Sequence, residues 1–177
     1  MSDIGEPDGL ERLWTPHRMA YVTGAEAPEG GYEKPAGCPF CVAPSRPDEE
    51  KYIVARGETV FAILNLYPYN PGHMLVCPYR HVADYTELTE EETAEVAAFT
   101  RRAMRTIRRA SSPHGFNLGM NQGAVAGAGI AAHLHQHVVP RWGGDGNFMP
   151  VIGRTKTMPM LLADTRTLLA KAWSETA

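Results

Sequence analysis

The chain has 177 residues, of which 44% are hydrophobic and 21% charged, and its formal net charge is −3 at pH 7. These values predict one soluble globular domain that is long enough to bury a core, and they give no indication of binding to nucleic acid. No apolar run approaches the roughly 20 residues that cross a bilayer, and the acidic segment Met1–Gly9 lacks the pattern of a secretory signal. We therefore expect a cytoplasmic protein without a membrane partner.

The first part of the chain divides into a tail, an aromatic segment and a loop. Residues 1–9 contain little to bury and are predicted to be a disordered tail, while residues 10–177 are predicted to form the single domain. The segment Leu13–Tyr21 is aromatic enough to pack on this domain or on a partner subunit. From Gly24 to Pro47 the chain is rich in Gly, Pro and Glu, which predicts a loop. Inside it, Cys38-Pro39-Phe40-Cys41 forms a tight knuckle.

Two apolar runs follow and predict a pair of strands. Val60–Leu64 is the first, and His73–Cys77, stopped by Pro78, is the second. Between them, Asn65–Gly72 contains two prolines, two asparagines and a glycine that turn the chain. We therefore expect a hairpin-like unit with a wide loop.

A long amphipathic helix comes next. Thr89 followed by Glu92 is a capping-box pattern, which marks the start of a helix. One apolar stripe with spacings of 3, 4 and 4 residues then predicts its buried face, and it consists of Val96, Phe99, Ala103 and Ile107. The helix should end before Pro113. Five arginines crowd its second half, and they indicate a solvated face or a polyphosphate site: Arg101, Arg102, Arg105, Arg108 and Arg109.

The last part of the chain alternates strands and loops and then closes with a helix. Phe116–Asn121 reads as a strand, Gly123–Gly129 as a loop, and His133–Val139 as a strand that Pro140 ends. Leu161–Trp173 has helical spacing and predicts an amphipathic helix that closes the core or a dimer. Strands that neighbour one another along the chain, with one long helix between two pairs, predict an α+β domain with an antiparallel sheet.

The histidine strand carries the strongest chemical signal. His133, His135 and His137 alternate, so their rings should share one face of a strand, roughly 7 Å apart. A histidine can attack phosphorus through one ring nitrogen when the other donates to a fixed acceptor, and a second histidine can hold the phosphoryl oxygens or protonate the leaving group. The glycine-rich loop before this strand suits an anion such as phosphate. The pattern therefore predicts covalent nucleotidyl or phosphoryl transfer.

The motif and its surroundings resemble the histidine triad family of nucleotide-binding hydrolases and transferases. The similarity rests on His133–Arg141 and extends back to Phe61–His81, where Asn65, Pro71-Gly72-His73 and Leu75 match the nucleoside-binding strand pair of that family. Further flanks resemble an actinobacterial branch that phosphorolyses diadenosine tetraphosphate, and they are Leu13–Pro16, Leu64–Gly72, Pro113–Asn117 and Pro140–Asp145. The resemblance implies a sheet of about five antiparallel strands that dimerisation extends.

The resemblance also implies roles for individual residues. His135 would be the nucleophile that forms a nucleotidyl-histidine intermediate, oriented by a backbone carbonyl, and His137 would contact the phosphate and help the leaving group. The nucleotide would be bound by six residues, namely Asn65, Leu75, Asn121, Gly127, Gly129 and His73, the last of which could equally have only a packing role. Two departures are visible. Gln136 replaces an apolar residue. Ala128–Ile130 stand where many relatives have Gln or Ser, which weakens the interpretation as a simple hydrolase and leaves room for an acceptor of the nucleotidyl group other than water.

The cysteine pair leaves two interpretations open. In a reducing compartment a C-x-x-C pair suggests a metal or redox site, and Pro44 and Pro47 argue against the helix that a thioredoxin-like motif would start. Zinc needs four ligands, for which His81 is a good third, and the resemblance makes His133 the fourth. A site of Cys38, Cys41, His81 and His133 would be structural, since the protein fills every position. The other interpretation is free thiols beside a hydrogen-bonded histidine. Cys77, alone in a strand, is expected to be a buried apolar residue.

Three functions are therefore considered. The first is a nucleotidyltransferase that cleaves diadenosine tetraphosphate with inorganic phosphate to ADP and ATP, acting as a homodimer or homotetramer. The second is a hydrolase of dinucleoside polyphosphates or nucleoside phosphoramidates, and the third is a nucleotide-binding sensor with little turnover. No organic cofactor is expected. The sequence does not decide whether Mg²⁺ takes part.

Overall fold

The computed structural model describes residues 37–146, 149–153 and 157–176. These residues belong to one compact unit of the chain, Pro35–Ala177. The predictions for residues 1–9 and for Leu13–Tyr21 lie outside the described residues. Among the helices that are described, none combines the length and the apolar character needed to cross a membrane.

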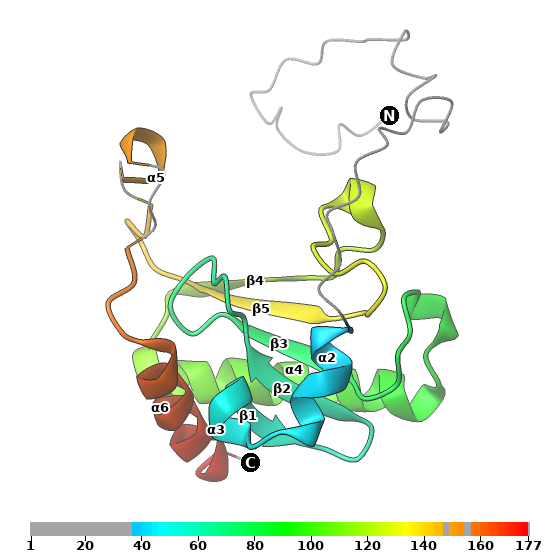
Figure 1. The fold of residues 1–177 in the computed structure, drawn as a ribbon. Coiled ribbons are helices and arrows are strands. Elements are labelled where there is room, and N and C mark those ends of the chain that lie inside the picture. The colour runs from blue at the N-terminus through cyan, green and yellow to red at the C-terminus, as the bar shows by residue number, and fades with distance from the viewer. Residues whose placement is uncertain (1–36, 147–148, 154–156, 177) are drawn as a thin grey trace, which may run out of the picture. The chain divides into compact units, whose positions relative to one another are not determined.

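Five antiparallel strands form one sheet in the order β1-β2-β3-β5-β4 (Figure 1). The strands are β1 (Ile53–Arg56), β2 (Val60–Leu64), β3 (Met74–Pro78), β4 (Gly115–Gly119) and β5 (Gln136–Arg141). The helices and single turns are α2 (Pro39–Val42), η2 (Ala43–Ser45), α3 (Asp48–Lys51), η3 (Tyr85–Glu87), α4 (Glu90–Ser111), η4 (Ala124–Ala126), α5 (Met149–Ile152) and α6 (Leu162–Ser174). The predicted α+β class with an antiparallel sheet is confirmed.

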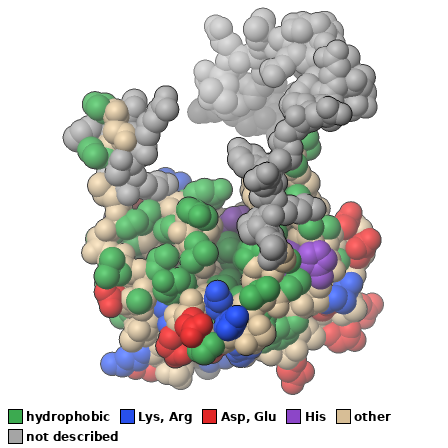
Figure 2. All heavy atoms as spheres, in the orientation of Figure 1, with side chains coloured by type: hydrophobic (Ala, Val, Ile, Leu, Met, Phe, Trp, Pro, Cys, Tyr) green, Lys and Arg blue, Asp and Glu red, His purple; other side chains and the backbone are tan. Residues whose placement is uncertain are grey.

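The two faces of the sheet bury different side chains because successive residues of a strand point to opposite faces. One face packs against α4 and α6, and its core includes Ala62, Met74 and Val138. In Figure 1, α4 runs behind the sheet and α6 lies at the lower left. The other face packs against α2, and its core includes Phe61 and Leu75. Figure 2, in the same orientation, shows histidine both inside a hollow between hydrophobic side chains and on the surface to the right of it.

The predicted long helix is confirmed in its start, its buried stripe and its end. The side-chain oxygen of Thr89 accepts from the backbone N–H of Glu92, whose carboxylate accepts from the N–H of Thr89, so the capping box is complete. α4 ends at Ser111, two residues before Pro113.

Three of the five arginines in the second half of α4 pack on neighbouring elements. Arg109 pairs with Glu175 over 2.7 Å, and the guanidinium of Arg102 lies 4.9 Å from the ring centroid of Trp173, both in α6 or directly after it. Arg108 lies 5.0 Å from the ring of Phe116 in β4. These contacts favour a packing role for this half of the helix over polyphosphate binding.

Several local predictions were wrong. The expected loop before Pro47 contains α2, so a single helical turn does start at the cysteine pair, and Pro39 at its first position is compatible with it. The predictions also omitted α3 and the edge strand β1, whose four residues give too short a pattern to recognise. β5 continues through Pro140 to Arg141, because Pro140 keeps an extended conformation and needs no N–H there.

Candidate active site and metal cluster

The histidine segment is not one continuous strand. His137 lies in β5, whereas His133 and His135 precede its first residue, Gln136. The backbone N–H of Leu134 donates to a carbonyl in the segment after β3 (2.7 Å), and the carbonyl of His133 accepts from a side chain, so neither group joins the sheet ladder. The predicted strand from His133 was therefore too long. The ring centroids of His135 and His137 lie 4.9 Å apart, closer than the predicted spacing of roughly 7 Å.

His135 has the geometry of a nucleophile. Its Nδ1–H donates to the backbone carbonyl of His133 over 2.8 Å, because a carbonyl can only accept. The proton is thus fixed on Nδ1, and Nε2 keeps a free lone pair. Burial lowers the pKa of His135, so the ring stays neutral at pH 7. The ring of Phe40, from the cysteine knuckle, lies 5.0 Å away and walls one side of it.

A second hydrogen-bond chain fixes the proton of His137. The backbone N–H of Tyr69 donates to Nδ1 of His73 over 3.1 Å, so the proton of a neutral His73 lies on Nε2. This nitrogen faces Nδ1 of His137 at 2.9 Å and donates to it. The remaining proton of His137 is therefore on Nε2. Burial, and secondly the neighbouring His135, lowers the pKa of His137 to about 4, so it acts as a neutral N–H donor at pH 7.

The complementary protonation of the two rings defines what the site can do. His135 presents a bare nitrogen that can attack phosphorus, and His137 presents an N–H that can bind a phosphoryl oxygen or a leaving oxygen. Both states are set by backbone groups, a carbonyl before β5 and an amide in the loop before β3. The site is thus arranged for nucleophilic substitution at phosphorus before any ligand binds.

The four predicted metal ligands lie together although more than 90 residues separate the first from the last. The ligand atoms of Cys38, Cys41, His81 and His133 all lie within 4.8 Å of one another. Nδ1 of His133 faces Sγ of Cys38 at 3.3 Å and Sγ of Cys41 at 3.5 Å, and Nδ1 of His81 faces Sγ of Cys41 at 3.2 Å. Nε2–H of His133 donates to the carbonyl of Pro78 over 2.9 Å, which leaves Nδ1 unprotonated and directed at the thiols. Two thiols and two imidazoles fit a tetrahedral zinc ion.

An ion pair holds the segment that carries His81. Arg80 donates through Nε and NH2 to both carboxylate oxygens of Glu92, at 2.9 and 2.7 Å. Glu92 is buried in the capping box of α4, and this arginine, followed by a capping hydrogen bond, lowers the pKa of its carboxyl group. Arg80 directly precedes His81, the predicted metal ligand. The ion pair therefore ties the chain that follows β3 to the start of α4.

The predicted nucleotide-binding residues surround the histidines, and their contact with a nucleotide stays a prediction. Leu75 is opposite His137 in the β3–β5 register. Nδ2 of Asn65 lies 3.4 Å from Nδ1 of His73. Asn121 shares a cavity with His137. His73 itself is 1% exposed, so the packing role foreseen for it is present.

The glycine-rich loop before the histidines contains η4, and its Gly127 lies beside Asn121. Gly127 has a φ of 85°, which favours glycine, and a Cβ there would lie 3.9 Å from Nδ2 of Asn121. Gly129 has open space where its side chain would be. The side chain of Gln136 lies on the α4 side of the sheet, as expected, and its Nε2 donates to the carbonyls of Gly119 and His137. Cys77 is fully buried, and burial raises the pKa of its thiol.

A polar brace near His137 escaped the sequence predictions. Asp145 accepts from Nε and NH2 of Arg141 at 2.7 and 2.9 Å and from Nδ2 of Asn70 at 2.7 Å. Arg141 holds the pKa of Asp145 well below its usual range. NH1 of Arg141 also donates to Asn117 over 2.7 Å. The brace joins the β2–β3 loop to the middle of β4 and the end of β5. The i, i+4 spacing of Arg141 and Asp145 was the one signal available in the sequence.

Fold and site together define a protein with three alternating histidines, the first of which also belongs to a Cys₂His₂ cluster. The model of the HIT domain family matches residues 46–144, and the chain belongs to the HIT family.

The particular relatives narrow this class. The chain is 54% identical to the AP-4-A phosphorylase of Mycobacterium tuberculosis over 175 residues, which are 97% of this chain and 88% of the relative. Among solved structures it resembles a zinc-bound histidine triad family protein from Mycobacterium smegmatis, with 29% identity, a TM-score of 0.64 and coverage of 78% of this chain and 94% of the other. It also resembles a hypothetical histidine triad nucleotide-binding protein from Sulfolobus tokodaii, with 31% identity, a TM-score of 0.65 and coverage of 78% and 93%. The predicted HIT-like fold is confirmed.

Proposed function

We propose that the protein is a diadenosine tetraphosphate phosphorylase, which converts diadenosine tetraphosphate and inorganic phosphate to ADP and ATP. The observation that carries this function is the near full-length identity to the AP-4-A phosphorylase of M. tuberculosis, which includes the flanks outside the matched HIT domain. The protonation pattern of His135 and His137 is the chemistry that such an enzyme requires.

The reaction follows from these two rings. Nε2 of His135 attacks the phosphorus of one terminal AMP unit, an N–P bond forms, and the P–O bond to ATP breaks. Nε2–H of His137 donates to the leaving oxygen, and the Nδ1–H bond of His135 to the His133 carbonyl stabilises the imidazolium as it forms. A phosphate oxygen then attacks the same phosphorus, the N–P bond breaks, and ADP leaves with His135 restored.

The choice of acceptor is tested by turnover with and without phosphate. We expect ADP and ATP in equal amounts at a rate that rises with phosphate concentration, because the adenylyl group stays bound to His135 until phosphate attacks it. The measurement is ion-exchange separation of the nucleotides from phosphate-free and phosphate-supplemented reactions. AMP and ATP formed at the same rate under both conditions would assign the protein to the hydrolases of the family instead.

The four-residue cluster is proposed to hold a structural zinc ion. The donor set and the hydrogen bond that frees Nδ1 of His133 support this, as does the likeness to a zinc-bound family member. When bound, zinc ties the knuckle to the residue whose carbonyl orients the nucleophile, and it supplies no group to the reacting phosphorus. Free thiols that must stay reduced to bind metal also support a cytoplasmic location.

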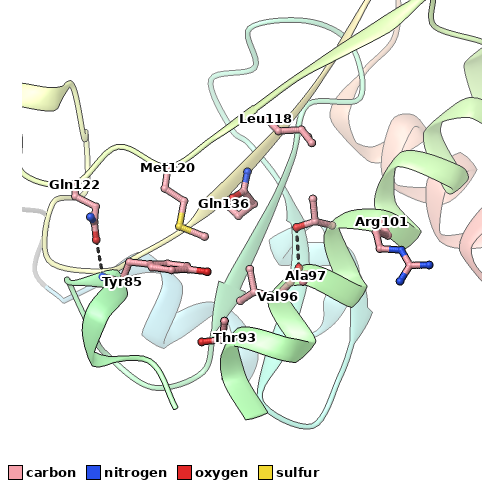
Figure 3. Close-up of a pocket in the computed structure, with 10 residues that line it drawn as sticks. Tyr85, Thr93, Val96, Ala97, Arg101, Leu118, Met120, Gln122 and Gln136 are labelled. Carbon is pink, nitrogen blue, oxygen red and sulfur yellow. Dashed lines mark hydrogen bonds between the residues drawn. The ribbon is translucent and has the colours of Figure 1, made fainter. Parts of the chain in front are cut away.

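We expect a homodimer formed through the edge strand β4 and α4. Beside β4 lies a cavity of about 560 Å³ between the two elements, with Val96 and Ala97 of α4 below Leu118 and Met120 (Figure 3). Leu118 is 48% exposed at the sheet edge. An apolar groove next to an unpaired strand edge suits a second copy that continues the sheet.

Leu118→Asp tests the dimer. A buried unpaired carboxylate at the centre of the interface should shift the protein to monomers, since such a charge costs several kcal/mol. The measurement is sedimentation velocity at matched concentrations, with the exposed residue Leu168→Asp in α6 as the control. A wild-type protein that sediments as a monomer would reject the dimer directly.

A further inference from the structure

The loop before β3 ends in a β-turn that carries His73. The backbone N–H of His73 donates to the carbonyl of Asn70 over 3.1 Å, which closes the four-residue turn. Pro71 and Gly72 are its two central residues, and Gly72 has a φ of 77°, as the third position of a type II turn requires. The N–H that donates to Nδ1 of His73 belongs to Tyr69, directly before the turn. A shift of Asn70 would therefore move both the backbone of His73 and the donor that fixes its tautomer.

The side chain of Asn70 anchors this turn to the end of β5. Asn70 is buried, and its Nδ2 donates to the carbonyl of Pro140 at 2.9 Å and to Oδ2 of Asp145 at 2.7 Å. Both hydrogens of the amide group are thus used. The turn also approaches β5 directly, since a Cβ at Gly72 would lie 3.9 Å from the ring of Pro140. The place of the turn on β5 is therefore set through Asn70.

Asp145 fixes the direction of the Asn70 amide. Besides this amide, its carboxylate accepts from Nε and NH2 of Arg141 and from the backbone N–H of Trp142 at 3.1 Å. Four donors thus converge on two oxygens, and a neutral amide at this position would turn an N–H group toward at least one of them. The guanidinium of Arg141 keeps the carboxyl group ionised at neutral pH, because it holds the pKa of Asp145 well below its usual range.

These contacts form an unbroken path from Asp145 to the proton donor of the reaction. Asp145 holds Asn70, and the turn that begins at Asn70 carries His73. Nε2–H of His73 then donates to Nδ1 of His137 over 2.9 Å. A general acid has to lie within about 2.6–3.2 Å of the atom that it protonates, and a misplacement of about 1 Å can cost roughly 100-fold in rate. A displaced turn would therefore weaken proton donation by His137.

We propose that Asp145 is a positioning residue for proton donation by His137 and that it acts through Asn70 and His73. The inference rests on the proposed function, in which the N–H of His137 donates to the leaving oxygen. Asp145 itself exchanges no proton, since both of its oxygens accept hydrogen bonds within the protein. Loss of its carboxylate should therefore affect departure of the leaving group more than attack by His135.

The experiment compares two esters of AMP, the p-nitrophenyl ester and the phenyl ester, in wild type, Asp145→Asn and Asn70→Ala. p-Nitrophenolate leaves readily without a proton, whereas phenolate, whose conjugate acid has a pKa of about 10, needs one. Both variants should lose roughly 10- to 100-fold more kcat/KM on the phenyl ester than on the p-nitrophenyl ester. In the double variant this ratio should equal that of Asn70→Ala, because Asp145 acts through Asn70.

Glu175→Gln is the matched control. The carboxylate of Glu175 accepts from Nε and NH2 of Arg109 at 2.9 and 2.7 Å, so the substitution breaks a two-point pair of the same kind directly after α6. It should leave the ratio of the two esters unchanged. Asn70→Ala keeps the pair of Arg141 and Asp145, and it decides whether the path exists if Asp145→Asn does not fold.

Nitrogen-15 NMR of the histidine rings reads the position of the proton itself. Wild type should show His137 with its proton on Nε2, and Asn70→Ala and Asp145→Asn should show a mixture of both tautomers. Folded variants with equal losses on both esters and an unchanged tautomer would overturn the proposal and leave the brace with a purely stabilising role. If wild type does not cleave diadenosine tetraphosphate, the proposed function fails by itself, and the tautomer in the variants still decides whether Asp145 acts on His137.

Discussion

His135→Asn is expected to lose turnover of diadenosine tetraphosphate by about four to six orders of magnitude, as happens when an enzyme loses its nucleophile. The asparagine amide can still donate to the carbonyl of His133, so the local hydrogen bond that fixes this position is retained. Since the pocket keeps its other groups, affinity for AMP should change by no more than about threefold, which is below 1 kcal/mol.

Two measurements check this result together. Steady-state kinetics gives the loss of turnover, and isothermal titration calorimetry with AMP shows that the nucleotide site is intact. Residual activity above about one hundredth of wild type, which is only 2.7 kcal/mol of transition-state stabilisation, would remove His135 from the role of nucleophile. Loss of both activity and AMP binding would point to misfolding, and circular dichroism separates that case.

Cys41→Ser is expected to release the metal and to lower the melting temperature by roughly 10–20 °C, which corresponds to about 5 kcal/mol for a chain of this size. Cys41 is exposed, so little packing is lost with its sulfur, and the effect should come from the broken cluster. Without the metal, the knuckle of Cys38 is held near His133 by the core packing of Phe40, which restrains it less than four metal bonds would. The position of Phe40 beside the nucleophile should loosen as well.

Metal analysis and thermal denaturation measure this effect. Wild type purified without chelator should contain about one zinc per chain. Cys77→Ala is the matched control, because its thiol is buried outside the cluster, and it should keep its zinc while losing some stability to a small cavity. Well-folded wild-type protein with almost no metal, and with the same melting temperature as Cys41→Ser, would contradict the zinc site.

The sequence allowed the fold class and the chemistry of the site to be predicted where patterns are local. The capping box of Thr89 and Glu92 and the apolar stripe of α4 both follow from helical spacing. The cluster of Cys38, Cys41, His81 and His133 was predicted from the C-x-x-C pair together with the family resemblance, which supplied His133, and these four residues do lie together.

What escaped prediction depends on distant contacts. The tautomer of His137 is set by His73, and that contact exists because Met74 and Val138 are paired in the β3–β5 register. No spacing within either strand reveals this register. The start of β5 at Gln136 likewise depends on a backbone bond from Leu134 to the segment after β3, so the strand begins three residues later than the start predicted at His133.

Mass spectrometry of the enzyme during turnover tests the central claim most directly. Protein mixed with diadenosine tetraphosphate without phosphate and quenched in alkali, where an N–P bond survives, should carry one adenylyl group on the peptide that contains His135. Added phosphate should discharge this group as ADP. Turnover without any adduct, or an adduct on a residue other than His135, would contradict the covalent mechanism.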